Sequence, residues 1–241
     1  MKIFIFIILF LMAGCGKDKA KVSEKLSDPE SKTENSGSGS ETASETISEE
    51  GSSADKKPIG YVQYTISKIP EEIKYQGTII AMAKWKDALG DNVVFVTETA
   101  ETSNEDTRSK ELYGYHYILN DDTGQLWRIY DFVKDCPLDL TLRYMDRSLE
   151  ITDLDSNGIG ESSFLYRLAC KGDVSSDDLK LIMHEGRDKY AIRGIMDIYL
   201  NGKLFQKGEM NLDPSYQNAP GKFSEYSVSK WNKFKTDNIG E

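Results

Sequence analysis

The feature that most constrains the fold is the stretch 151–170, where a loop of oxygen-bearing residues runs directly into an alternating apolar pattern. After the loop, apolar side chains recur at every second position, at Phe164, Tyr166, Leu168 and Cys170. A two-residue period places these side chains on one face of a β-strand. A strand here is incompatible with an EF-hand, whose calcium loop is followed by a helix.

The loop carries side-chain oxygens at the spacing of a calcium site. Alternate positions hold Asp, Asp and Asn, a glycine then permits a sharp turn, and the next residue can offer its backbone carbonyl. The expected ligands are Asp153, Asp155, Asn157, Ile159 and Glu161. Position twelve is Phe164 instead of glutamate, which also excludes an EF-hand. Only three carboxylates would contribute, so we expect weak binding, with a Kd on the order of 10⁻⁴ M or weaker. The same residue types also favour a metal-free hairpin turn, and both interpretations stay open here.

Similar alternation elsewhere predicts an all-β domain, mostly antiparallel, built as a meander or sandwich. The expected strands cover residues 75–85, 92–99, 113–119, 125–133, 138–144, 149–151, 161–170, 179–184 and 189–199. Residues 138–144, 149–151 and 161–170 would form a three-stranded meander, and residues 100–110 a polar loop.

Two further features complete the predicted fold. Loops of the Asp-x-Asp-x-Asn-Gly type between strands resemble those of integrin-type propeller blades, so blade-like hairpins are a second architecture to consider. Two such units cannot close a ring, which favours the sandwich. Helical spacing of apolar residues over 223–234 predicts a short C-terminal amphipathic helix on the sheet.

The N-terminus has the order of a secretory signal. Lys2 precedes an apolar run from Ile3 to Met12 that is too short to span a bilayer as a mature helix. The run ends in Leu-Met-Ala-Gly-Cys, which resembles the lipobox of bacterial lipoproteins, although Met12 stands where leucine is usual. Residues 1–14 are therefore expected to be a lipoprotein signal peptide, and Cys15 to be lipidated and to anchor the protein in a membrane. Gly16, where aspartate would favour the inner membrane, indicates the outer membrane.

Composition divides the rest of the chain. Residues 15–57 are rich in Ser, Glu, Lys and Gly with almost no apolar side chains, which predicts a disordered tether. Residues 58–241 then form a single β-rich domain. The formal net charge of −10 argues against a nucleic-acid partner.

With Cys15 assigned to the lipid, Cys136 and Cys170 remain. Outside the inner membrane thiols meet an oxidising environment, so these two are expected to form a disulfide. It would join the start of the strand at 138–144 to the end of the strand at 161–170 and close the meander around the metal loop.

No nucleophile or metalloprotease motif is present, and His116 and His184 read as packing or surface residues on strands. Carboxylates are abundant, but no pair stands out as an acid/base pair. Trp85, Trp127 and Trp231 are expected in the core, with a sugar-binding face as the alternative.

Several segments resemble a family of Bacteroidota lipoproteins that carries a surface-polysaccharide biosynthesis label. They are WKDALGDNVV, YILNDDTGQLWRIYDFVKDC, ITDLDSNGIGESSFLYRLACKGDVSSDDLKLIMHEG and KYAIRG, within residues 73–197. The resemblance implies a link to envelope polysaccharide and brings no catalytic residues.

The expected function is thus a non-catalytic binding or assembly role in surface-polysaccharide biogenesis. The protein would sit on the periplasmic face or the cell surface, with a glycan or an envelope-assembly protein as partner. The alternatives are a carbohydrate-active hydrolase and a purely structural envelope protein.

Overall fold

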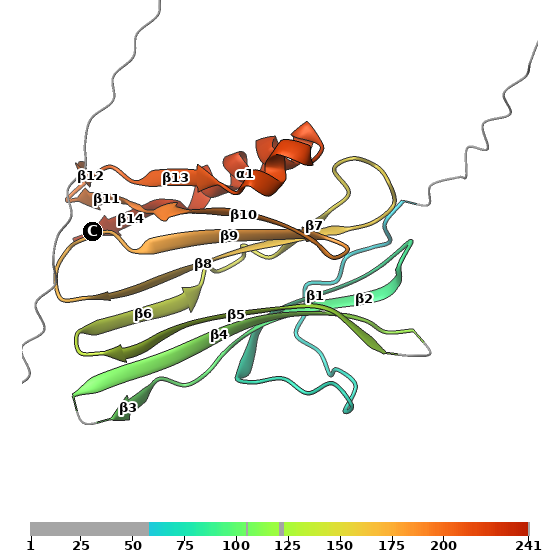
Figure 1. Cartoon of the computed structure of the whole chain (residues 1–241), viewed down its shortest axis with the longest axis horizontal. Coiled ribbons are helices and arrows are strands. Elements are labelled where there is room, and N and C mark those ends of the chain that lie inside the picture. Colours follow the sequence, from blue (N-terminus) through green and yellow to red (C-terminus); the bar gives the residue numbers. More distant parts are fainter. Residues whose placement is uncertain (1–57, 105, 121–122, 241) are drawn as a thin grey trace, which may run out of the picture. The chain divides into compact units, whose positions relative to one another are not determined.

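The computed structural model describes residues 58–104, 106–120 and 123–240, which form two large stacked β-sheets, a small third sheet and one C-terminal α-helix (Figure 1). The all-β prediction with a C-terminal helix is confirmed. No helix in the described part of the chain is both long and apolar enough to span a bilayer.

The first sheet has five strands, with β4 at its centre. Its strands are β1 (Thr78–Asp87), β2 (Gly90–Glu98), β3 (Thr102–Asn104), β4 (Thr107–Ile118) and β5 (Gly124–Cys136). The predicted polar loop at 100–110 is wrong, because β3 pairs with the first residues of β4 as a short hairpin. β3 is exposed and the first residues of β4 are half-buried, and their hydroxyl and charged side chains show no apolar alternation from which a strand could be predicted.

The second sheet has six strands and is built around β8 and β9. Its strands are β6 (Asp139–Tyr144), β7 (Glu150–Thr152), β8 (Glu161–Lys171), β9 (Asp178–Glu185), β10 (Asp188–Ile195) and β13 (Glu209–Leu212). The predicted meander is wrong in its pairing, because β6 and β7 both pair with β8, one with each half. The chain leaves the sheet between them through a turn in which Arg147 has φ 61°.

The C-terminal region also contains a third, small sheet and a short 3₁₀ helix. Most of these elements were not among the predicted ones. The elements are β11 (Asp197–Leu200), β12 (Lys203–Gln206), a 3₁₀ helix (Pro214–Asn218), α1 (Gly221–Phe234) and β14 (Thr236–Ile239). β14 pairs with β11 in parallel, across a separation in sequence that no local pattern reveals.

The main core lies between the two large sheets. Both contribute buried apolar side chains to one cluster, among them Val94 and Leu112 from the first sheet and Leu142, Phe164 and Ile182 from the second. The sheets therefore stack face to face as a sandwich and not as neighbouring propeller blades.

Each sheet is also covered on its outer face. α1 packs Phe223 and Trp231 on the second sheet, where the predicted amphipathic helix is confirmed. The side chain of Lys230 is buried at this contact, with its Nζ 2.9 Å from Glu150 Oε2 and 2.8 Å from Ser163 Oγ. On the first sheet, the segment that carries Ile73 covers part of an aromatic cluster.

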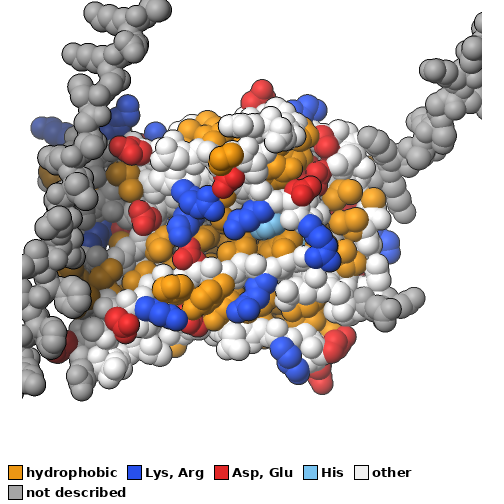
Figure 2. Space-filling view, in the orientation of Figure 1, with side chains coloured by type: hydrophobic (Ala, Val, Ile, Leu, Met, Phe, Trp, Pro, Cys, Tyr) orange, Lys and Arg blue, Asp and Glu red, His pale blue; other side chains and the backbone are white. Residues whose placement is uncertain are grey.

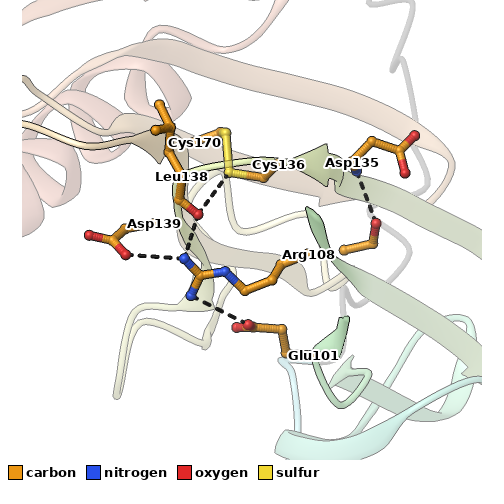
Figure 3. The surroundings of a disulfide bond; sticks show 8 residues. Glu101, Arg108, Asp135, Cys136, Leu138, Asp139 and Cys170 are labelled. Carbon is orange, nitrogen blue, oxygen red and sulfur yellow. Dashed lines mark hydrogen bonds and ion pairs between the residues drawn. A yellow bond between two sulfur atoms is a disulfide. The ribbon is translucent and has the colours of Figure 1, made fainter. Parts of the chain in front are cut away.

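The predicted disulfide is confirmed, and it joins the two sheets (Figure 3). Cys136 is the last residue of β5, whereas Cys170 lies near the end of β8. The bond therefore does not close a meander around the metal loop. Beside it, Arg108 donates to the Leu138 carbonyl at 2.5 Å and pairs with Asp139 at 3.1 Å, which ties the crossing between the sheets to β4.

Candidate functional site

The predicted metal loop lies between β7 and β8, and the fold gathers its carboxylates. Oxygen atoms of Asp153, Asp155 and Glu161 all lie within 4.8 Å of one another. Positive φ angles at Ser156 (62°) and Gly158 (81°) produce the tight turn that brings them together. Hard oxygen donors at this spacing can hold a cation.

Strand pairing adds a carboxylate that the sequence analysis missed. Glu185 ends β9 directly opposite Glu161 in β8. Like charges facing each other across a β-ladder are destabilising. Burial, followed by the charges of Asp155, Asp188 and Asp153, raises the pKa of Glu185. The only signal in the sequence is the Glu-Gly turn after β9, which becomes informative once the β8–β9 register is known.

One of the predicted ligands, Asn157, is placed differently from expectation. Asn157 faces the acidic cluster through its side-chain nitrogen, which donates to Asp155 Oδ2 at 3.1 Å and to Glu185 Oε1 at 2.5 Å. Its oxygen accepts the backbone N–H of Ile159 at 2.8 Å. A cation would be bound by oxygen, so Asn157 would have to turn its amide to serve as a ligand.

The carboxylates of the loop lie close together, and within the part of the chain that the structure describes no cationic side chain pairs with them to balance their negative charge. Glu161 is fully buried, and its desolvation raises the pKa of the carboxyl to about 7. Its oxygens accept hydrogen bonds from Thr152 and from the Leu154 N–H, which partly offset this cost. One carboxylate oxygen of Asp153 is buried without a hydrogen-bond partner among the described residues. The donor set therefore fits a hard cation.

The first sheet holds the loop in place. The carboxylate of Asp87, at the β1–β2 turn, accepts hydrogen bonds from the Gly160 N–H at 2.9 Å and from the Trp85 indole at 2.8 Å. The Ala88 N–H donates to the Gly158 carbonyl at 2.9 Å. A side chain at Gly160 would collide with the Trp85 indole, since a Cβ there would lie 2.6 Å from its nitrogen.

A second feature is a ladder of aromatic rings across the outer face of the first sheet. Neighbouring ring centroids along it lie 5.0 to 5.9 Å apart. In order, the rings are Tyr75, Phe95, Tyr115, Tyr113, Tyr130 and Phe132. The middle of the ladder is buried, but Tyr130 and Phe132 are 42% and 44% exposed.

Cations flank the exposed end of this ladder. The Arg128 guanidinium lies 5.0 Å from the centroid of the Tyr113 ring, and Lys134 Nζ lies 4.7 Å from that of Phe132. We call Arg128, Tyr130, Phe132 and Lys134 the β5 strip. Figure 2 shows hydrophobic side chains flanked by Lys and Arg side chains over the lower layer, where β4 and β5 lie.

A cavity of about 690 Å³ opens at a different place, beside β1. Its walls include Tyr64, Ile66 and Tyr144, with Arg147 and Glu150 as charged neighbours. The Tyr64 hydroxyl accepts the Ile151 N–H at 2.9 Å, which joins the cavity wall to β7. Its size and apolar lining are typical of small-ligand sites.

The histidines and tryptophans belong to the core. His116, Trp127 and His184 are buried between the sheets, and the rings of Trp127 and His184 stack at 4.3 Å. Burial lowers the pKa of His116 to about 4 and that of His184 to about 3, so both are neutral at physiological pH. Trp85 and Trp231 are also buried, so the core interpretation is confirmed and the exposed aromatics are Tyr and Phe.

The predicted lipidation site, Cys15, and the tether at 15–57 lie outside the described residues. Comparisons of the chain with protein-family models, curated proteins and solved structures found no match.

Proposed function

We propose that this protein is an outer-membrane-anchored lipoprotein whose β-sandwich binds cell-surface polysaccharide without catalysing a reaction. The observation that carries the proposal is the exposed end of the aromatic ladder on β5. The faces of aromatic rings are electron-rich and attract positively polarised groups. The C–H faces of a sugar ring are such groups, and they pack flat on exposed tyrosine and phenylalanine rings.

The β5 strip has the properties of a surface for a chain ligand. Tyr130 and Phe132 stand two residues apart on the same face of an extended strand, so their rings repeat along the strand direction. The Tyr130 hydroxyl donates to Glu111 Oε1 at 2.8 Å, and Tyr113 donates to the other oxygen of that carboxylate at 2.7 Å. These bonds fix the rings before a ligand arrives, which lowers the entropy lost on binding.

The test is binding of the purified β domain to immobilised bacterial surface polysaccharides, both neutral and acidic. We expect retention by at least one polysaccharide, with no reducing sugar released. Tyr130→Ala and Phe132→Ala should each weaken binding, whereas Tyr64→Ala, in the separate cavity, should not. Loss of binding only in Tyr64→Ala would move the site to that cavity. Turnover that depends on a single carboxylate would favour the hydrolase alternative.

We also propose that the acidic loop binds Ca²⁺ through Asp153, Asp155 and Glu161, with Glu185 beside them as a further acid. Asn157, with its amide turned, and the Ile159 carbonyl would complete the shell. Calcium would supply the positive charge that the buried Glu161 and its half-buried acidic neighbours lack, and would stiffen the junction between the β1–β2 turn and β8. The loop is thus assigned a structural role in support of the binding domain.

Thermal unfolding with calcium and with chelator tests the metal proposal. A site with a Kd near 10⁻⁴ M is about hundredfold saturated at roughly 10 mM calcium, which stabilises the native state by about 2.7 kcal/mol. This corresponds to a rise in Tm of about 5–10 °C for a domain of this size. Asp153→Asn should abolish most of the rise, and the exposed Asp173→Asn should leave it intact. An identical Tm in the two buffers would disprove the proposal.

A further inference from the structure

We propose that the β5 strip is selective for acidic polysaccharides, because Arg128 presents its guanidinium to a sugar carboxylate. This inference rests on the proposed polysaccharide binding and names the ligand class of the same surface. Its basis is the charge balance around the strip, in which Glu111, Glu98 and Asp131 are already paired and Arg128 is not.

Three carboxylates near the strip, those of Glu111, Glu98 and Asp131, are each engaged by another group. Glu111 accepts two tyrosine hydroxyls and lies 3.9 Å from Lys134. The Tyr113 hydroxyl, followed by that of Tyr130, holds the pKa of Glu111 below its usual range, so this acid is ionised. Glu98 pairs with Lys110, and Asp131 points to the other sheet, where it meets Lys180 Nζ at 2.5 Å.

Arg128 differs from these neighbouring cations. It is exposed, and no carboxylate of the described residues lies within ion-pair distance of its guanidinium. It stands opposite Tyr115 in the β4–β5 register, with its guanidinium 5.0 Å from the centroid of the Tyr113 ring and 5.9 Å from that of Tyr130. These rings orient the planar group while its N–H donors remain available in solvent.

A fixed guanidinium matches a carboxylate through two parallel N–H···O bonds. Tyr130 is its neighbour on the same face, so a sugar whose ring packs on Tyr130 would bring a ring carboxylate within reach of Arg128. Lys134, at the other end of the strip, offers a second positive charge for the next acidic unit. A uronic acid chain therefore matches the rings and the unpaired Arg128 together, with Lys134 shared between Glu111 and the ligand, which neither a neutral glycan nor an apolar peptide would do.

The experiment compares acidic surface polysaccharides with the same polymers after reduction of their carboxyl groups, at low and high salt. We expect wild-type protein to bind the acidic form at least tenfold more tightly, with the difference shrinking at high salt as charges are screened. Arg128→Gln should remove the preference. The exposed Arg143→Gln on β6 is the matched control and should retain it. Unchanged Tm values of both variants would show that folding is intact.

The other outcomes separate this inference from the proposed function. Equal binding of acidic and reduced polymers, or a preference that survives Arg128→Gln, overturns the selectivity while leaving polysaccharide binding in place. No binding to any polysaccharide overturns both. Arg128-dependent binding to glycan-free vesicles of phosphatidylglycerol would assign the strip to a membrane surface. Arg128-dependent dimerisation in sedimentation experiments would assign it to a second copy of the chain.

Discussion

At the scale of single residues, the protonation state of the buried Glu161 determines how the stability of the acidic loop depends on pH. In the native state the pKa of Glu161 is about 7, above the ordinary value of 4.5. Between pH 4.5 and 7 the native state therefore binds a proton that the unfolded state has lost. The resulting stabilisation is fully present below pH 4.5 and is lost as the pH rises through 7. A bound cation must displace this proton, so calcium affinity should weaken as the pH falls below 7.

Glu161→Gln imitates the protonated carboxyl and tests this assignment. In chelator at pH 8 we expect the variant to have a higher Tm than wild type, and at pH 4.5 the two should be equal. The exposed Glu225→Gln on α1 is the matched control and should change neither value. A lower Tm for Glu161→Gln at pH 8 would contradict the raised pKa.

The buried His184 should lower the stability of the protein in acid. The folded pKa of His184, about 3, lies below its ordinary value of 6.5, so unfolding takes up a proton. The stability from the neutral imidazole is fully present above pH 6.5 and is lost as the pH falls toward 3. His184→Phe preserves the stacking on Trp127 and removes the titration. As the pH is lowered from 6 to 4, the free energy of unfolding of the variant, measured in urea, should decrease less steeply than that of wild type. The difference in slope should be about 1.4 kcal/mol per pH unit. Equal slopes would refute the burial argument.

At the scale of elements, the disulfide holds β5 to β8 at the end of the sandwich remote from the acidic loop. Its loop of 34 residues corresponds to about 4 kcal/mol in the chain-entropy model. The Cys136→Ala, Cys170→Ala double variant should lose about this much free energy of unfolding in urea titration and still fold, because the core between the sheets is intact.

The position of the disulfide gives this experiment an internal control. Cys170 and Glu161 lie at opposite ends of β8, about 30 Å apart at the rise of an extended strand. The rise in Tm produced by calcium should therefore be the same in the double variant and in wild type. A reduced rise would indicate that the bond supports the loop directly.

At the scale of the whole molecule, the proposed lipid anchor and the β-sandwich should act independently. Fatty acyl chains on Cys15 would hold the protein at a membrane through their own burial, independently of the sandwich core. We expect Cys15→Ser to move the protein from the membrane to the soluble fraction and to abolish labelling by radioactive palmitate. The Tm of the β domain should not change. A membrane-bound, unlabelled Cys15→Ser protein would refute the anchor.

The fold class and the local chemistry of this protein follow from its amino-acid sequence alone. Alternating apolar residues give a strand its two faces wherever it pairs, so the main strands and the sandwich can be predicted. The spacing of Asp153, Asp155 and Glu161 likewise implies convergent oxygens, since a tight turn brings alternate residues together.

Which strands pair and which charges meet depends instead on the folding of the whole chain. β6 and β7 share β8 because a turn removes residues 145–149 from the sheet, and β14 joins β11 across a long separation in sequence. Glu185 enters the acidic loop through strand register, and Arg128 gains its aromatic support from β4. Contacts between distant segments depend on the register and packing of whole sheets, which no pattern within one segment contains.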